Sequence, residues 1–199
     1  MMSARTAPTR ESASVMLVLT RGAIGGMIAG MAMAMFAMVA SVTYQLHGFF
    51  TPLFHISALF GSPKSMMTSI GEAMAGNRFW FAAGPAFVGL MIHMVTGAAY
   101  GMVFALVARR LHRSALVPAG MGFGLATFFV SSFVGLRIAA TITGSGTTIS
   151  EMAKMVGWST FALEHIMFGL VLGALALRWS PASKGADADT GARSAMLAS

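Results

Sequence analysis

The chain has 199 residues, of which 56% are hydrophobic and only 10% are charged, with a net charge of +7 and no cysteine. A soluble domain carries about 25% charged residues, so too few polar side chains exist here to cover a water-soluble fold. The missing cysteines exclude disulfides, thiolate metal sites and cysteine nucleophiles. Most basic residues lie near the chain ends and in one loop, which favours a lipid bilayer as partner and argues against nucleic acid.

Long apolar runs in the chain predict transmembrane helices. The first run exceeds the apolar core of a signal peptide, roughly 7–15 residues, so we expect it to be retained as a membrane anchor. Each run can cross a hydrocarbon layer of about 30 Å. Residues 1–19, which are polar and basic up to about residue 14, and the polar residues 179–199 are predicted to be disordered cytoplasmic tails. The predicted spans, within a transmembrane domain of residues 20–178, are residues 22–45, 85–107, 115–138 and 157–178.

Two loops between the spans contain further structure. Residues 48–60 are aromatic and apolar but interrupted by Pro52, and they are too short to span, so we expect an interfacial or re-entrant segment. Residues 68–76 predict a short helix on the membrane surface. Ser69 and Glu72 have the spacing of a capping box, as do Thr148 and Glu151 in the second loop. The predicted fold is an all-α bundle of four transmembrane helices with these outer segments.

The distribution of arginine predicts the orientation. The short loop between the second and third spans carries Arg109, Arg110 and Arg113, whereas the longer loops at 47–84 and 139–157 carry few positive charges. Loops rich in Lys and Arg stay in the cytoplasm. We therefore expect a multi-pass protein of the cell inner (cytoplasmic) membrane with both termini in the cytoplasm.

A glycine pattern predicts close helix contacts. In the second and fourth spans, His93 and His165 are each followed by glycine four and eight residues later, and residues four apart share one face of a helix. Such small-xxx-small (GxxxG) ladders let helix backbones approach. The pattern predicts a two-fold repeat of helix pairs; the alternative is that glycine recurs in any membrane helix. The helix-packing glycines are Gly22, Gly26, Gly30, Gly97, Gly101, Gly120, Gly124, Gly169 and Gly173.

Four ionisable residues in or beside the spans are candidates for function. An ionisable residue within a membrane span is costly and is by default a functional-site hypothesis. His93 and His165 should lie at similar depth, since their helices run in the same direction. Glu164 needs a partner, for which Arg137 at the outer end of the third span is the first choice. The alternative for the histidines is that each imidazole hydrogen-bonds a neighbouring helix and holds the bundle together.

Several chemistries are open to these residues. A matched histidine pair could ligate a b-type haem, with His93 and His165 as the cofactor-binding residues; otherwise no cofactor is expected. Methionines along the first span could bind a soft metal, but the 19 methionines of the chain are spread widely and indicate packing instead. No metal site and no catalytic residue are predicted, since no hydrolase, kinase or dinucleotide motif is found.

The sequence resembles the YagU-like group of small bacterial inner-membrane proteins and related uncharacterised four-helix families. The resemblance rests on the glycine-rich first helix (Gly25 to Gly30), the run from His93 to Gly101 before a basic loop, and Glu164-His165 in the last helix. It covers about half the chain. It implies a four-span inner-membrane topology and carries over no catalytic residues.

The sequence therefore favours a non-enzymatic membrane protein that is transport-related or accessory and acts through its bundle interior. A bis-histidine haem protein that passes electrons and a structural or assembly subunit of a membrane complex remain alternatives. Spare helix faces make a homo-oligomer or a partner in a membrane complex plausible. The sequence does not identify a small-molecule substrate.

Overall fold

The computed structural model describes residues 10–179, and this part of the chain is helical with no β-strand. The all-α fold class is therefore confirmed. Four of the described helices are long and apolar enough to cross a membrane, which is the pattern of a multi-pass membrane protein. In lipid, a helix satisfies all of its backbone hydrogen bonds within one segment, which is why these apolar runs are helical. The four candidate spans are Ser14–Thr43, Ala83–Ala108, Arg113–Thr143 and Trp158–Trp179.

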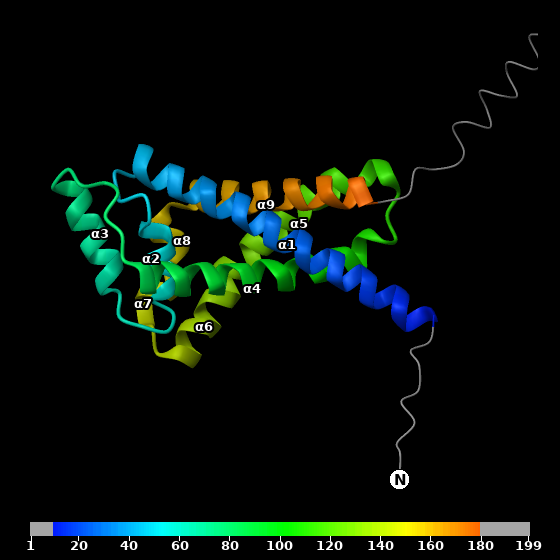
Figure 1. The fold of residues 1–199 in the computed structure, drawn as a ribbon, viewed down its shortest axis with the longest axis horizontal. Helices are drawn as coiled ribbons and strands as arrows, with labels where there is room; N and C mark the ends of the chain where they lie inside the picture. The colour runs from blue at the N-terminus through cyan, green and yellow to red at the C-terminus, as the bar shows by residue number, and fades with distance from the viewer. Residues whose placement is uncertain (1–9, 180–199) are drawn as a thin grey trace, which may run out of the picture.

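Apart from the third, each candidate span lies within a single helix, as Figure 1 shows. The third span is composite, because a five-residue π-helical segment interrupts it. The first helix begins upstream of the predicted start, so residues 10–19, predicted to be a disordered tail, are helical; residues 1–9 and 180–199 lie outside the described residues. The elements are α1 (Arg10–Thr43), α4 (Ala83–Ala108), η1 (Arg113–Ala115), α5 (Leu116–Val130), the π segment η2 (Ser131–Gly135), α6 (Leu136–Thr143) and α9 (Trp158–Trp179).

Two helix pairs are closed by glycine. In the pair α1/α4, a Cβ added at Gly26 would overlap the backbone carbonyl of Gly97. In the pair α5/α9, a Cβ added at Gly124 would overlap the backbone carbonyl of His165. Gly122, two residues before Gly124, has no such neighbour within 4 Å. In both pairs, therefore, glycine is required where one helix backbone rests on another.

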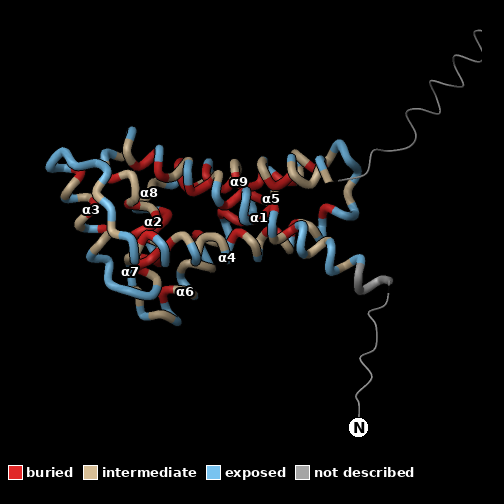
Figure 2. The backbone as a smooth tube through the Cα atoms, viewed as in Figure 1, coloured by how far each residue is buried: buried red, intermediate tan, exposed pale blue. Residues whose placement is uncertain are grey.

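The two helix pairs contact each other mainly through one helix of each pair. Helices α1 and α9 pack along much of their length, and there Ala29, Phe168 and Leu172 form part of a buried cluster. Helices α4 and α5 make few contacts. In Figure 1, the start of α1, the loop between α4 and α5, and the end of α9 all lie at one end of the bundle, which we call the basic end because Arg109, Arg110 and Arg178 lie there. In Figure 2, the buried residues are concentrated where the spans meet and near the end of the bundle opposite the basic end.

Four short helices cover that opposite end. We call them together the cap. Helix α2 packs against α4, where a Cβ added at Gly89 would overlap the carbonyl of Leu53. A left-handed Gly144 (φ +71°) ends α6 before the second part of the cap begins. The cap consists of α2 (Thr51–Ser57), α3 (Lys64–Met74), α7 (Gly146–Ser150) and α8 (Met152–Val156).

The cap differs from the sequence prediction in its details. Helix α3 begins at Lys64, so Ser69 lies in its middle, and its hydroxyl bonds the hydroxyl of Thr51 at 2.8 Å. Likewise Thr148 lies inside α7. Both predicted capping boxes are therefore wrong, because each helix begins before the serine or threonine that was expected to cap it. The segment at 48–60, expected to be interfacial or re-entrant, contains a short helix, α2, most of which is buried within the protein.

Candidate functional site

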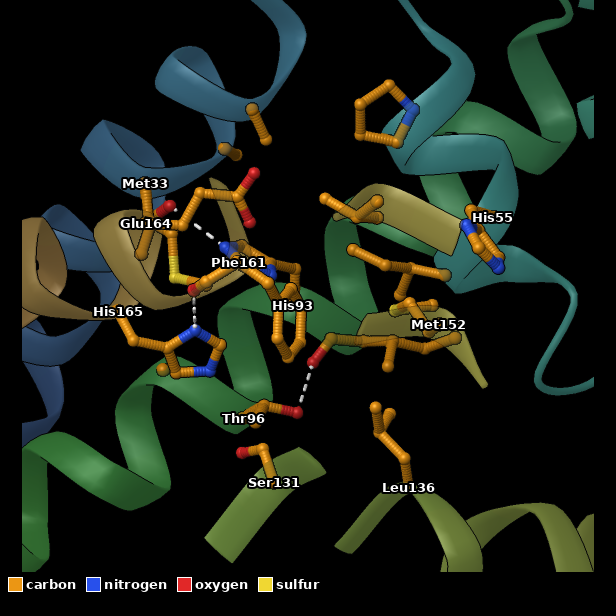
Figure 3. Close-up of a pocket in the computed structure, with 18 of the residues that line it drawn as sticks. Met33, His55, His93, Thr96, Ser131, Leu136, Met152, Phe161, Glu164 and His165 are labelled. Carbon is orange, nitrogen blue, oxygen red and sulfur yellow. Dashed lines mark hydrogen bonds between the residues drawn. The ribbon is translucent and has the colours of Figure 1, made fainter. Parts of the chain in front are cut away.

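A cavity of about 310 Å³ lies between the four spans, in the half of the bundle next to the cap. Its wall is mostly apolar, with a few polar side chains that converge on it. Each candidate span contributes to the wall, and so do α2, α7 and α8. A concave, largely apolar site with few polar groups is the usual form of a small-molecule site. The polar side chains, several of them labelled in Figure 3, are Gln45, His55, His93, Thr96, Tyr100, Thr127, Ser131, Glu164 and His165.

His93 joins two helices. Its Nε2–H on α4 donates to the backbone carbonyl of Gly30 on α1, at 3.0 Å. Because Gly30 has no side chain, the carbonyl is open to the imidazole. This bond is the interhelical role that the sequence offered as the alternative to a functional one. The ring also lines the cavity, so the same residue supports the helix pair and faces the interior.

His165 has a different partner. Its Nδ1–H donates to the carbonyl of Phe161 at 2.7 Å, one turn earlier on the same helix α9. The two rings of these residues are 4.6 Å apart between centroids. His93 and His165 both line the cavity, and Figure 3 draws both in the same part of it. Of the two histidines, predicted to lie at similar depth, only His93 bonds across helices.

Glu164 is buried and unpaired. Its side chain is only 4% exposed, and Oε1 has no hydrogen-bond partner. The expected pairing with Arg137 is wrong, because Arg137 is exposed and the two form no ion pair within residues 10–179. Arg137 lies in α6 with its side chain at the surface of the bundle, and it does not line the cavity. Figure 3 shows Glu164 directed into the cavity beside His93.

The cavity reaches the bundle surface between α4 and η2. Thr96 lies midway along α4, lines the cavity and is exposed at the surface. On the other side, Ser131, Gly135 and Leu136 line the cavity from η2 and the start of α6. The hydroxyls of Tyr100 and Ser131 bond at 3.2 Å across this gap. A π segment beside a cavity is a frequent feature of functional sites, and nothing in the sequence predicted it.

The sequence also did not reveal the importance of His55. Its Nε2–H on α2 donates to the carbonyl of Thr148 on α7 at 2.7 Å, and so joins the two parts of the cap above the cavity. Burial lowers the pKa of His55, with a smaller contribution from nearby His47, while the bond to Thr148 acts in the opposite direction. The only signal in the sequence was a histidine flanked by apolar residues beside Pro52.

The geometry does not favour a bis-histidine haem site. The Nε2 of His93, the nitrogen that a haem iron would need, already donates to Gly30. Across the described range 10–179, no group of three or more His, Asp or Glu side chains is arranged to hold a metal ion. The arrangement is instead that of an apolar chamber with one acidic side chain.

Comparison of the chain with protein-family models, with curated proteins and with solved structures finds no match. Four spans, a cap and an internal chamber define the class as a helical multi-pass membrane protein. Any more specific function must therefore be argued from the site itself.

Proposed function

We propose that this chain is a small, non-enzymatic, transport-related or accessory protein of the bacterial inner membrane that acts through its internal cavity. One observation carries the proposal. The cavity is bounded by all four spans and by the cap, and it contains a buried carboxyl side chain, Glu164, whose Oε1 has no partner. A purely structural bundle gains nothing from a carboxyl group in its interior, since such a group is costly in a membrane.

We propose that both termini face the cytoplasm. The chain ends of the described range and the arginine loop lie at the same end of the bundle in Figure 1. The positive-inside rule favours the cytoplasm for that end, so the cap and the cavity lie toward the outer face. The proposed repeat of helix pairs is consistent with the glycine contacts in both pairs, and it accords with the resemblance to small four-span inner-membrane proteins.

Single cysteines test the orientation, because the natural chain has none. Ser62 lies in the loop between α2 and α3, and Ser114 lies in the arginine loop; both are exposed. In intact cells we expect an impermeant maleimide to label Ser62→Cys, whereas Ser114→Cys reacts only after the membrane is permeabilised. The opposite pattern would overturn the orientation.

The accessibility of the cavity tests the role of the interior. Ala34 is 4% exposed and lines the cavity, whereas Met31 on the same helix is 43% exposed at the lipid-facing surface. A small uncharged methanethiosulfonate reagent, which can reach the cavity from water or from the bilayer, should modify Ala34→Cys in membrane vesicles. Met31→Cys is the matched control and should remain unmodified. If Ala34→Cys remains unmodified, a function through the interior is refuted.

A further inference from the structure

The cavity contains an acid but, among the residues that the structure describes, no lysine or arginine to pair with it. Glu164 is directed into the cavity with Oε1 unpartnered. No lysine or arginine of the described chain lines the cavity. The hydrogen bonds of the His93 and His165 rings go to backbone carbonyls and not to Glu164. A positively charged group brought by a ligand would therefore meet a carboxyl group that nothing within the protein occupies.

The rest of the cavity wall suits an apolar ligand, to which it offers apolar and aromatic side chains. Met33, Leu53 and Ile92 provide apolar surface, while Tyr100 and Phe168 provide aromatic rings. Aromatic faces attract cations, and the attraction is larger where water is excluded. An apolar molecule gains free energy by burying its surface against such a wall. The cavity thus combines the two features that bind an apolar cation.

The opening of the cavity favours a ligand that is dissolved in the bilayer. Thr96, where the cavity reaches the surface, is midway along α4 and hence at the depth of the hydrocarbon core. The gap is bordered by η2 on the other side, and the Tyr100–Ser131 bond lies across it. A molecule arriving there comes from among the acyl chains, so it must be lipophilic.

We propose that the cavity binds a lipophilic monocation, an apolar molecule with one amine or quaternary ammonium group, and that the charged nitrogen lies at Glu164. This inference rests on the proposed function, since it names the class of molecule on which the interior acts. It adds a specific requirement for positive charge, which an apolar cavity alone does not impose.

Three probes of similar size and different charge test the requirement. They are 4-phenylbutylamine, which is a cation, 4-phenylbutanol, which is neutral, and 4-phenylbutyrate, which is an anion. Binding to the purified full-length protein in detergent is measured by the shift in unfolding temperature over a concentration series. We expect the amine to bind at least tenfold more tightly than the alcohol, because hydrogen bonds to charged groups exceed neutral ones by about that factor, and the butyrate to bind least.

Variants locate the binding. Glu164→Gln keeps the shape of the side chain and removes the charge, and should abolish the preference for the amine over the alcohol. Glu151→Gln is the control, because Glu151 is exposed and pairs with Lys154 at 3.6 Å outside the cavity; it should leave all three affinities unchanged. Ala34→Phe should fill the cavity and weaken every probe.

The outcomes separate this inference from the proposed function. Equal binding of amine and alcohol, or an amine preference that survives in Glu164→Gln, overturns the requirement for a cation while the accessibility of Ala34→Cys still supports the interior role. Binding of no probe to the wild-type protein also overturns it. If Ala34→Phe leaves the amine affinity unchanged, the amine binds elsewhere and the inference fails.

Discussion

The two helix pairs, α1/α4 and α5/α9, pack alike and differ in chemistry. In each pair, glycines bring one backbone against the other, and each pair presents one histidine to the cavity. In the first pair, His93 bonds across to Gly30. In the second, His165 bonds within its own helix, and the neighbouring Glu164 is left without a partner for Oε1. The first pair thus serves as the scaffold, and the second carries the carboxyl group that lacks a partner.

The largest effect is expected where the two pairs are alike. Gly26→Ala and Gly124→Ala should each lower the free energy of unfolding by about 3 kcal/mol, because the new methyl group meets a backbone carbonyl and the helices must separate. Gly122→Ala has open space and is the control; it should gain up to about 1 kcal/mol of helix stability. Equilibrium unfolding in mixed micelles measures all three. A tolerated Gly124→Ala would show that the second pair is not closed like the first.

The next largest effect on stability is expected at Glu164, where the two pairs differ. Glu164→Leu should raise the free energy of unfolding by roughly 2 kcal/mol, since it removes a buried polar group that lacks a partner. The same unfolding assay applies, with Glu151→Leu at an exposed site as control. A loss of stability in Glu164→Leu would mean that the carboxyl group supports the second pair.

A smaller effect distinguishes the two histidines. His93→Leu removes a bond between helices and should cost about 0.6 kcal/mol, the average for such bonds in membranes. His165→Leu removes a bond to a carbonyl of its own helix, so we expect a smaller change. Unfolding of both variants side by side provides the measurement. Equal losses would contradict the assignment of the scaffold role to the first pair.

The smallest effect concerns the bond that joins the two halves of the cap. Burial lowers the pKa of His55 from its ordinary value of 6.5, so the detached cap takes up a proton more readily than the folded cap. The contribution of His55 to cap stability is therefore complete above pH 6.5 and decreases as the pH falls below that value. Hydrogen exchange of α2 and α7 at about pH 7.5 and about pH 5.5, on either side of the ordinary histidine pKa, measures this. In His55→Gln, which cannot titrate, the pH dependence should be smaller; an unchanged dependence would assign it elsewhere.

Much of the fold could be predicted because lipid imposes strict conditions on a chain. The apolar runs predicted each candidate span to within a few residues at most ends. Of the glycines with four-residue spacing, Gly26 and Gly124 lie against another helix backbone, whereas Gly30 meets only side chains. The contact of Gly89 was not predicted. The start of α1 at Arg10 was missed, because a helix can continue beyond the apolar part of its sequence. The capping boxes failed because a short spacing such as that of Ser69 and Glu72 does not determine where a helix begins.

The candidate site was predicted in part. His93, Glu164 and His165 stood out because ionisable residues are rare within apolar runs. The partner of Glu164 was not predictable, because the sequence indicates the depth of Arg137 in its span but not whether its side chain faces the cavity or the surface. His55 was missed for another reason: its bond to Thr148 joins segments 93 residues apart in the chain, and nothing local in the sequence indicates such a contact.

The backbone-to-backbone contact of Gly26 with Gly97 limits how this chain can evolve. Where two side chains meet, a larger one can be accommodated by a smaller one opposite. At this contact the obstacle is a peptide carbonyl, which every amino acid carries, so no second substitution can restore the fit. Both positions should therefore accept glycine alone in a saturation library, including in variants whose cavity has been redesigned for another ligand.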